Sequence, residues 1–271
     1  MNTLLHVHTY PWTDAIVDVA IAPRTMTHLR LVAGAKNLRL LPTLENLVAL
    51  WCFRPNAADI DFISETPALR TLFIDTLRAK VAISRLGSLR SLSVLHLEAC
   101  SHERSLDWLD AFPTLRGLGV VHFRNVHELG ALTRQPHIRW LSVAGSMWSK
   151  MTVKSLAPIA ELKDLEYLDL TSLRAEDASL EGLAALKQLK TLVIANVYPA
   201  TEFARLAGRL PNCSCPWFSP YVPFPAMACT KCGEHTLVIL TGKGEPTLCT
   251  ACDATRLKRH VEHFERARDA S

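Results

Sequence analysis

Apolar residues recur along the chain in a six-residue phrase, at its first, fourth and sixth positions, with other residues between them. Nine copies follow one another, and their starts are 21 to 27 residues apart. The copies are Met26/Leu29/Leu31, Leu47/Leu50/Cys52, Leu69/Leu72/Ile74, Leu92/Leu95/Leu97, Leu115/Leu118/Val120, Ile138/Leu141/Val143, Leu165/Leu168/Leu170, Leu189/Leu192/Ile194 and Leu210/Cys213/Cys215. The fourth and sixth side chains share one face of a short strand. One unit cannot bury that face by itself, so the pattern predicts a stack of about nine repeats over residues 26–218.

The other half of many repeats carries apolar residues three positions apart. Leu180, Leu183 and Leu186 are one such set. This spacing predicts a helical turn, either α or 3₁₀, that faces the same core as the strand. We therefore expect an α/β fold in which each repeat supplies one short strand and one short helical turn.

The recurring L-x-x-L-x-L phrase resembles the signature of leucine-rich-repeat proteins, and its short period is similar to the internalin-like bacterial class. The resemblance covers about residues 26–218. It implies an α/β solenoid with a parallel β-sheet on the concave face and short helices or 3₁₀ turns on the convex face. The ninth position of that family is commonly Asn, whereas this chain has residues such as Leu77, Cys100 and Phe123 there. Without the Asn side chains we expect less regular turns.

Both ends of such a stack need a cap, because an open sheet edge invites aggregation. Residues 1–25 precede the first repeat, and the alternation of Ile16, Val17, Val19 and Ile21 predicts a capping strand there. The repeat that starts at Ile138 is the longest, so we expect a protruding loop over residues 147–154.

Four of the eight cysteines form two CxxC pairs. They are Cys229 with Cys232 and Cys249 with Cys252, separated by sixteen residues. Four thiolates at this spacing suit a structural, tetrahedral Zn²⁺ site, and reduced metal-free pairs or disulfides are the alternatives. We expect residues 219–271 to form a zinc-binding module with a hairpin around residues 242–244 and a helix over residues 253–268. The other cysteines, Cys52, Cys100, Cys213 and Cys215, are expected to pack in the core.

The order of knuckle, hairpin, second CxxC pair and helix resembles the treble-clef arrangement of GATA-like zinc fingers over about 30 residues. That resemblance implies a structural Zn²⁺ and suggests a contact with DNA or RNA as a further role. The helix carries basic residues at helical spacing, which are candidates for that contact: Arg256, Arg259, His260, His263 and Arg266. However, the aromatic-rich start of the GATA helix is missing. From Cys229 onward the chain contains seven Lys/Arg and six Asp/Glu residues. This near balance of charge favours a solvated helix of mixed charge.

In leucine-rich repeats the strand residues between the leucines point out of the concave face. The resemblance places two aromatic clusters with charged neighbours on that face. The first consists of Arg30, Trp51, Phe53, Phe73, Asp75, His96 and Glu98, and the second of Trp140, Tyr167 and Asp169. Gly117 and Gly119 lie between them and predict a depression. Exposed aromatics beside charges are typical of protein interfaces, so we expect a partner-binding surface here. Alternatively, the N-terminal segment or the aromatics themselves cover these rings.

Net charge, hydropathy and the N-terminal residues bear on the partners and the location of the protein. The net charge is +4, too weak to indicate nucleic acid by itself. No run of 18 apolar residues occurs, so we expect no membrane contact. The first residues do not resemble a secretory signal, and paired CxxC motifs suit a reducing compartment, so we expect a cytoplasmic location.

Motifs of catalysis are missing from the sequence. It contains no G-x-S-x-G, no H-E-x-x-H and no phosphate-binding glycine loop. A four-thiolate zinc site has no open coordination position for water. We therefore predict a non-catalytic recognition protein that binds a protein partner and no small-molecule substrate. The alternative is a nucleic-acid-associated adaptor that contacts DNA or RNA through its zinc module.

Overall fold

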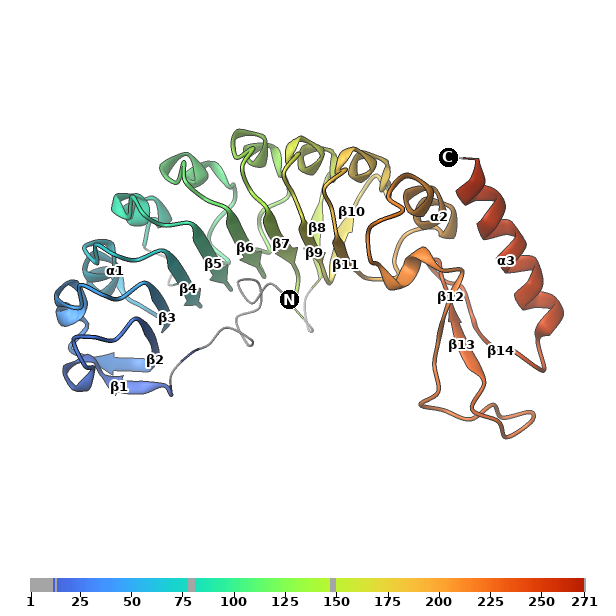
Figure 1. Cartoon of the computed structure of the whole chain (residues 1–271), viewed down its shortest axis with the longest axis horizontal. Coiled ribbons are helices and arrows are strands. Elements are labelled where there is room, and N and C mark those ends of the chain that lie inside the picture. Colours follow the sequence, from blue (N-terminus) through green and yellow to red (C-terminus); the bar gives the residue numbers. More distant parts are fainter. Residues whose placement is uncertain (1–11, 13, 78–80, 147–149, 271) are drawn as a thin grey trace.

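The computed structural model describes residues 12, 14–77, 81–146 and 150–270. These residues form an arch with strands along its inner side and short helices along its outer side (Figure 1). The predicted solenoid is confirmed, with strands on the concave face and helical turns on the convex face.

The concave face is one sheet, whose strands within the described residues number nine and are ordered β1-β2-β3-β4-β5-β6-β7-β9-β11. Each strand pairs in parallel with the strand of the next repeat. The strands are β1 (Ile16–Asp18), β2 (His28–Lys36), β3 (Ala49–Phe53), β4 (Thr71–Asp75), β5 (Val94–Glu98), β6 (Gly117–Val121), β7 (Trp140–Ala144), β9 (Tyr167–Leu170) and β11 (Thr191–Ile194). β1 lies at the open edge beside β2, where the capping strand was expected.

The core lies between the sheet and the helical turns. Equivalent leucines pair across neighbouring strands, as Leu50 does with Leu72, Leu72 with Leu95 and Leu95 with Leu118, and none of these four is exposed. Burying a leucine side chain stabilises a protein by about 1.5–3 kcal/mol. Stacking the repeats therefore supplies the burial that one repeat lacks.

The convex face consists mainly of 3₁₀ helices, because a short repeat leaves few residues to return the chain to the next strand. They are η2 (Val19–Ile21), η3 (Leu38–Thr43), η4 (Ile83–Ser88), η5 (Asp107–Ala111), η6 (Gly130–Arg134), η7 (Ala157–Glu161), η8 (Glu181–Ala185) and η9 (Pro216–Phe218). Two repeats have an α-helix instead, α1 (Ala57–Ser64) and α2 (Ala200–Arg209). α1 begins at a capping box, in which Asn56 and Asp59 bond each other's backbone N–H.

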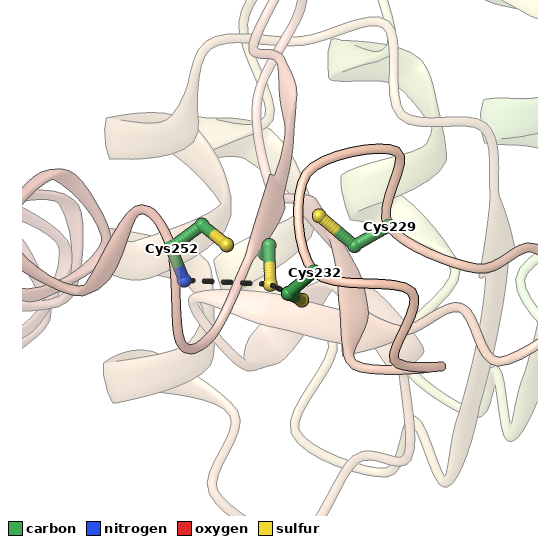
Figure 2. A group of neighbouring side chains, drawn as sticks. Cys229, Cys232 and Cys252 are labelled. Carbon is green, nitrogen blue, oxygen red and sulfur yellow. Dashed lines mark hydrogen bonds between the residues drawn. The ribbon is translucent and has the colours of Figure 1, made fainter.

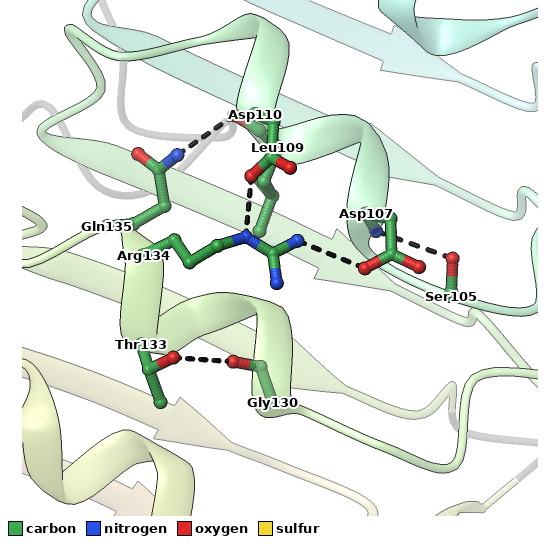
Figure 3. Close-up of polar contacts among 8 residues, drawn as sticks. All are labelled: Ser105, Asp107, Leu109, Asp110, Gly130, Thr133, Arg134 and Gln135. Carbon is green, nitrogen blue, oxygen red and sulfur yellow. Dashed lines mark hydrogen bonds and ion pairs between the residues drawn. The ribbon is translucent and has the colours of Figure 1, made fainter.

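Neighbouring convex turns are joined by polar contacts (Figure 3). The guanidinium of Arg134 donates to Asp110 at 2.6 Å and to Asp107 at 3.0 Å. Gln135 is 5% exposed, and its Nε2 donates to the carbonyl oxygen of Leu109 at 2.9 Å. The buried amide thus satisfies a backbone carbonyl of the preceding repeat.

The turns after β3, β4, β5 and β6 share one conformation, so the expectation of less regular turns is wrong for these four. Arg54, Thr76, Ala99 and His122 have φ between 50° and 62°, in the left-handed region. Each donates its N–H to the last carbonyl of the next strand at 2.8–2.9 Å. The residues that follow three of them fill the space of the missing Asn side chains, because Leu77, Cys100 and Phe123 are buried.

The long repeat builds a strand where a protruding loop was predicted. Within residues 147–154, β8 (Met151–Val153) pairs in parallel with β10 (Leu173–Ala175), and Met151 and Val153 are buried. The loop prediction is wrong for this part because two apolar side chains enter the core. Residues 147–149 lie outside the described part of the chain.

The C-terminal module closes the far end of the arch (Figure 1). β12 (Tyr221–Pro223), β13 (Leu237–Leu240) and β14 (Thr247–Cys249) form an antiparallel sheet, followed by α3 (Ala254–Asp269). The predicted hairpin and helix are therefore present. α3 packs along α2, and Phe264 is fully buried in the core of the repeats. The ninth phrase adds only a single parallel bridge, between Thr191 and Ser214.

Along the part of the chain that the structure describes, no helix has both the length and the apolar character needed to cross a membrane.

Candidate functional site

The register of the sheet brings the predicted partner-binding residues side by side on the concave face. One row runs across the strands as Arg30, Trp51, Phe73, His96, Gly119, Ser142, Asp169 and Val193. A second row contains Phe53, Asp75 and Glu98, and a third contains Gly117, Trp140 and Tyr167. Parallel strands in register align equivalent positions, so residues 21 to 27 apart in sequence become neighbours.

The first cluster surrounds a hollow of about 330 Å³. Its lining contains all seven residues predicted for that cluster, together with Ile74. The Arg30 guanidinium lies 4.1 Å from the centroid of the Trp51 ring, and Phe53 stacks on Trp51 with centroids 5.1 Å apart. Trp51 is thus fixed by a cation–π contact and an aromatic stack.

The second cluster is joined to the first by stacked rings. The centroids of Phe73 and His96 are 5.2 Å apart, those of His96 and Trp140 6.2 Å, and those of Trp140 and Tyr167 6.0 Å. The predicted depression is absent at Gly119, because the His96 ring fills it. A Cβ atom on Gly119 would lie 2.1 Å from Nδ1 of His96.

A hollow of about 700 Å³ lies at the edge where the strands begin, and Gly117 is among its lining residues. Trp140 and Tyr167 line it together with charged residues, among them Arg116 and Glu166. A Cβ atom on Gly117 would lie 3.3 Å from Trp140 and from Val94, so these two neighbours pack close against the glycine.

The expectation that these aromatics are exposed is wrong for four of the five rings. Trp51 is 7%, Phe73 1%, Trp140 4% and Tyr167 9% exposed. They pack on one another, and Trp12, from the N-terminal segment, lies against Trp51 and Phe73 with centroids 5.6 and 5.3 Å away. These contacts agree with the alternative expectation, that the N-terminal segment and the aromatic residues themselves cover the rings. The half-buried members of the site are Arg30, Phe53, Asp75, His96, Glu98 and Asp169.

One residue of this surface, Trp12, was missed by sequence reasoning, and the hydrogen bonds of Ser142 and Thr171 to Asp169 were not foreseen. Trp12 lies outside the repeats, so no periodic signal points to it. Ser142 donates to Asp169 Oδ2 at 2.9 Å, and Thr171 donates its N–H to Oδ1 at 2.9 Å. Asp169 is consequently held in one orientation on the concave face.

The four cysteines of the C-terminal module converge, as predicted, and their sulfur atoms all lie within 4.8 Å of one another (Figure 2). Cys229 and Cys232 come from the loop between β12 and β13, Cys249 ends β14, and Cys252 precedes α3. The sulfurs of Cys232 and Cys249 are 3.8 Å apart. A tetrahedral Zn²⁺ with bonds of about 2.3 Å requires sulfurs about 3.8 Å apart, so the set fits a metal of this kind.

Hydrogen bonds favour the thiolate at Cys249. The backbone N–H of Cys252 donates to its sulfur at 3.5 Å, and the Thr236 hydroxyl lies 3.2 Å from it. These contacts lower the pKa of Cys249 to about 6. Asp253 accepts from the Cys249 N–H at 3.1 Å and from Lys231 at 3.0 Å, which lowers its pKa and ties the two CxxC loops together.

Comparisons with known proteins add little beyond the fold. No family model matches the sequence, and no curated protein matches it. Among solved structures, an internalin (inlF) from Listeria monocytogenes aligns at 14% identity and TM-score 0.46, covering 70% of this chain and 66% of that one. The mouse RP105/MD-1 complex aligns at 17% identity and TM-score 0.49, covering 69% and 33%. The chain thus spans less than two thirds of the length of either structure.

The observation that identifies the fold is the arrangement of the chain's own strands and turns. Strands β2 to β7, β9 and β11 each carry one L-x-x-L-x-L phrase or its apolar equivalent, and each is followed by a turn facing the same core. The chain has the fold of a leucine-rich-repeat solenoid. The cysteine cluster therefore lies at the C-terminal end of a leucine-rich-repeat stack, away from the first aromatic cluster (Figure 1).

The remaining cysteines belong to the core of the solenoid, as predicted. Cys52, Cys100, Cys213 and Cys215 are buried. Burial raises the pKa of Cys52, Cys100 and Cys215 to about 12 and that of Cys213 to about 11. These thiols remain protonated at neutral pH.

The basic stripe expected on α3 is present except for His260. Arg256, Arg259, His263 and Arg266 are exposed along one side of the helix. The His260 side chain is 9% exposed, and its Nε2 is 2.9 Å from the Pro220 carbonyl oxygen. Its inclusion among the nucleic-acid contacts is wrong, because this side chain packs the helix onto the module.

Proposed function

We propose that the solenoid is a non-catalytic recognition protein that binds a protein partner on its concave face. The observation that carries this proposal is the set of three in-register rows that gathers Arg30, five aromatic residues and three carboxylates on the concave face, beside two hollows. Arginine and aromatic residues are the types enriched at protein interfaces. In this proposal the partner contacts four half-buried residues of the concave face, Phe53, Asp75, Glu98 and Asp169. The buried rings pack beside them and hold the surface in place.

The same row extends to Val193, which is 37% exposed although it is a large apolar residue in a strand. It follows Asp169 on the concave face. An apolar side chain therefore reaches solvent next to a fixed carboxylate at this end of the row.

We further propose that the four cysteines hold a structural Zn²⁺. Soft thiolates select zinc over hard cations, and four of them close its coordination shell. The module has its own apolar cluster of only Val238, Leu240 and Leu248. A structural zinc contributes about 10–16 kcal/mol in small fingers, so it would supply most of the module's folding free energy. We also propose a cytoplasmic location, because the eight cysteines, all among the described residues, form no disulfide.

A charge-reversal pair tests the recognition proposal. Glu98→Arg reverses the charge at the end of strand β5, on the concave face. Glu161→Arg makes the same reversal on the exposed convex turn η7. We expect Glu98→Arg to lower recovery of a specific partner in affinity capture by at least tenfold and Glu161→Arg to leave it unchanged. Equal recovery with both variants would refute the concave placement.

A second candidate function rests on the exposed stripe of Arg256, Arg259 and Arg266 on α3. Three guanidinium groups on one side of a helix can meet a phosphate backbone. Glu262 and Glu265 on the same helix reduce its positive potential. Binding of duplex DNA or RNA that weakens steeply with salt, and disappears when the three arginines are replaced by Gln, would favour this candidate.

A further inference from the structure

Trp12 packs on the concave face although it belongs to no repeat. Its ring meets Phe73 edge-on, with an interplanar angle of 87°, and meets Trp51 at 50°. The edge-on contact with Phe73 is one of the geometries that aromatic pairs prefer. Trp51 and Phe73 are neighbours on β3 and β4, so the indole spans two repeats.

The two rings beneath Trp12 are held in place by other side chains. Arg30 and Phe53 flank Trp51, and His96 stacks on Phe73 at 30°. A receptor whose rings are fixed in advance loses little side-chain entropy when it binds a further ring. We call the two rings that Trp12 contacts, Trp51 and Phe73, together with Arg30 against Trp51, the aromatic socket.

We propose that the aromatic socket binds an aromatic side chain of the protein partner, and that Trp12 occupies the socket until the partner displaces it. This rests on the proposed function. The seated indole indicates the chemistry of the occupant, since it is the group that the socket accommodates in this chain. An aliphatic side chain would provide neither the edge-to-face contact with Phe73 nor the tilted contact with Trp51.

Displacement is favoured by the position of Trp12 in the chain. It precedes β1, so its departure removes no strand of the sheet and no residue of the leucine core. While Trp12 is seated, the affinity for a competing ring is reduced by the fraction of molecules whose socket is open. The seated Trp12 therefore sets the threshold for partner binding.

The test uses N-acetyl-tryptophanamide as the probe and N-acetyl-leucinamide as its control, titrated by NMR into the full chain. Trp12→Ala empties the socket. Trp108→Ala removes an indole from the convex turn η5, where it packs on Phe112, and is the matched control. The double variant Trp12→Ala/Trp51→Leu removes the floor of the socket, and circular dichroism verifies that each variant is folded.

We expect Trp12→Ala to bind N-acetyl-tryptophanamide about tenfold more tightly than the wild type, and Trp108→Ala to bind as the wild type does. The gain should vanish in the double variant, and N-acetyl-leucinamide should not bind. Equal affinity of wild type and Trp12→Ala, no binding to Trp12→Ala, or a gain that survives Trp51→Leu would each overturn the inference. If partner capture is lost with Glu98→Arg but is identical for wild type and Trp12→Ala, the inference fails while the proposed function stands.

Discussion

Asn196 holds Gly242 against the last repeat. Its Nδ2 donates to the Leu240 carbonyl at 2.9 Å, and its Oδ1 accepts the N–H of Gly242 at 2.7 Å. Gly242 has φ +127°, and a Cβ atom on it would lie 3.0 Å from Cβ of Ala200 and 3.1 Å from its backbone nitrogen. The hairpin of the cysteine module thus contacts the first residue of α2 so closely that only glycine fits.

Replacing Gly242 should detach the module from the solenoid. We expect Gly242→Ala to lower the free energy of unfolding by about 2–3 kcal/mol, because it adds backbone strain and a contact with Ala200. Urea unfolding measures the loss. Gly244→Ala is the matched control, since Gly244 has φ +79° with no atom near its Cβ position. Its loss should be smaller, about 1 kcal/mol, and equal losses would show that the contact with α2 is unimportant.

Metal removal should expose one set of thiols and not the other. With zinc bound, a thiol reagent at pH 8 should modify none of the cysteines rapidly, because the module thiolates are coordinated and the core thiols are buried with raised pKa values. A chelator should make four thiols reactive, and denaturant all eight. Mass spectrometry locates the modified residues. Modification of Cys52 or Cys100 in the chelated, undenatured protein would contradict this prediction, because it would mean that metal removal also opens the core of the solenoid.

The left-handed turn at Ala99 predicts a stabilising substitution. Ala99 has φ 56°, a conformation that costs an alanine about 1–2 kcal/mol and a glycine almost nothing. Glycine loses more entropy on folding, by about 0.5–1 kcal/mol. Ala99→Gly should therefore stabilise the chain by about 0.5 kcal/mol, measured by urea unfolding. Ala49→Gly, in the regular strand β3, is the control and should destabilise it.

Two adjacent residues of the convex face should differ in importance (Figure 3). Gln135→Ala removes a buried hydrogen bond to the Leu109 carbonyl, which keeps the N–H of Phe112 as its other donor, so the expected cost is about 0.5–1.5 kcal/mol. Arg134→Ala removes only surface ion pairs, in which the Arg134 side chain is 44% exposed, so its effect on thermal stability should be much smaller. Thermal denaturation compares the two variants. A larger loss with Arg134→Ala would reverse this ranking.

The sequence predicted what depends on local spacing. The period of the leucines determined strand, turn and core, because each repeat faces the same two neighbours. The CxxC spacing predicted which sulfurs converge. The register likewise brought Trp51 beside Phe73 and Trp140 beside Tyr167, as the repeat implied.

Exposure was not predictable in the same way. Whether Trp51 is accessible depends on rings from other strands and on Trp12, which carries no periodic signal. The His96 ring over Gly119 depends on a side-chain orientation that the spacing does not specify. The left-handed residues after the strands were missed because none of Arg54, Thr76, Ala99 and His122 is the glycine that usually marks this conformation.

Site-specific photo-crosslinking tests the central claim, that the concave face binds a protein partner, most directly. A benzophenone amino acid replaces Val193, which is exposed on the concave sheet, or Glu161 on the convex turn η7. The account predicts a discrete crosslinked species from position 193 that is absent at position 161 and is lost when Glu98→Arg is added. Crosslinking from the convex position, or from neither, would contradict it.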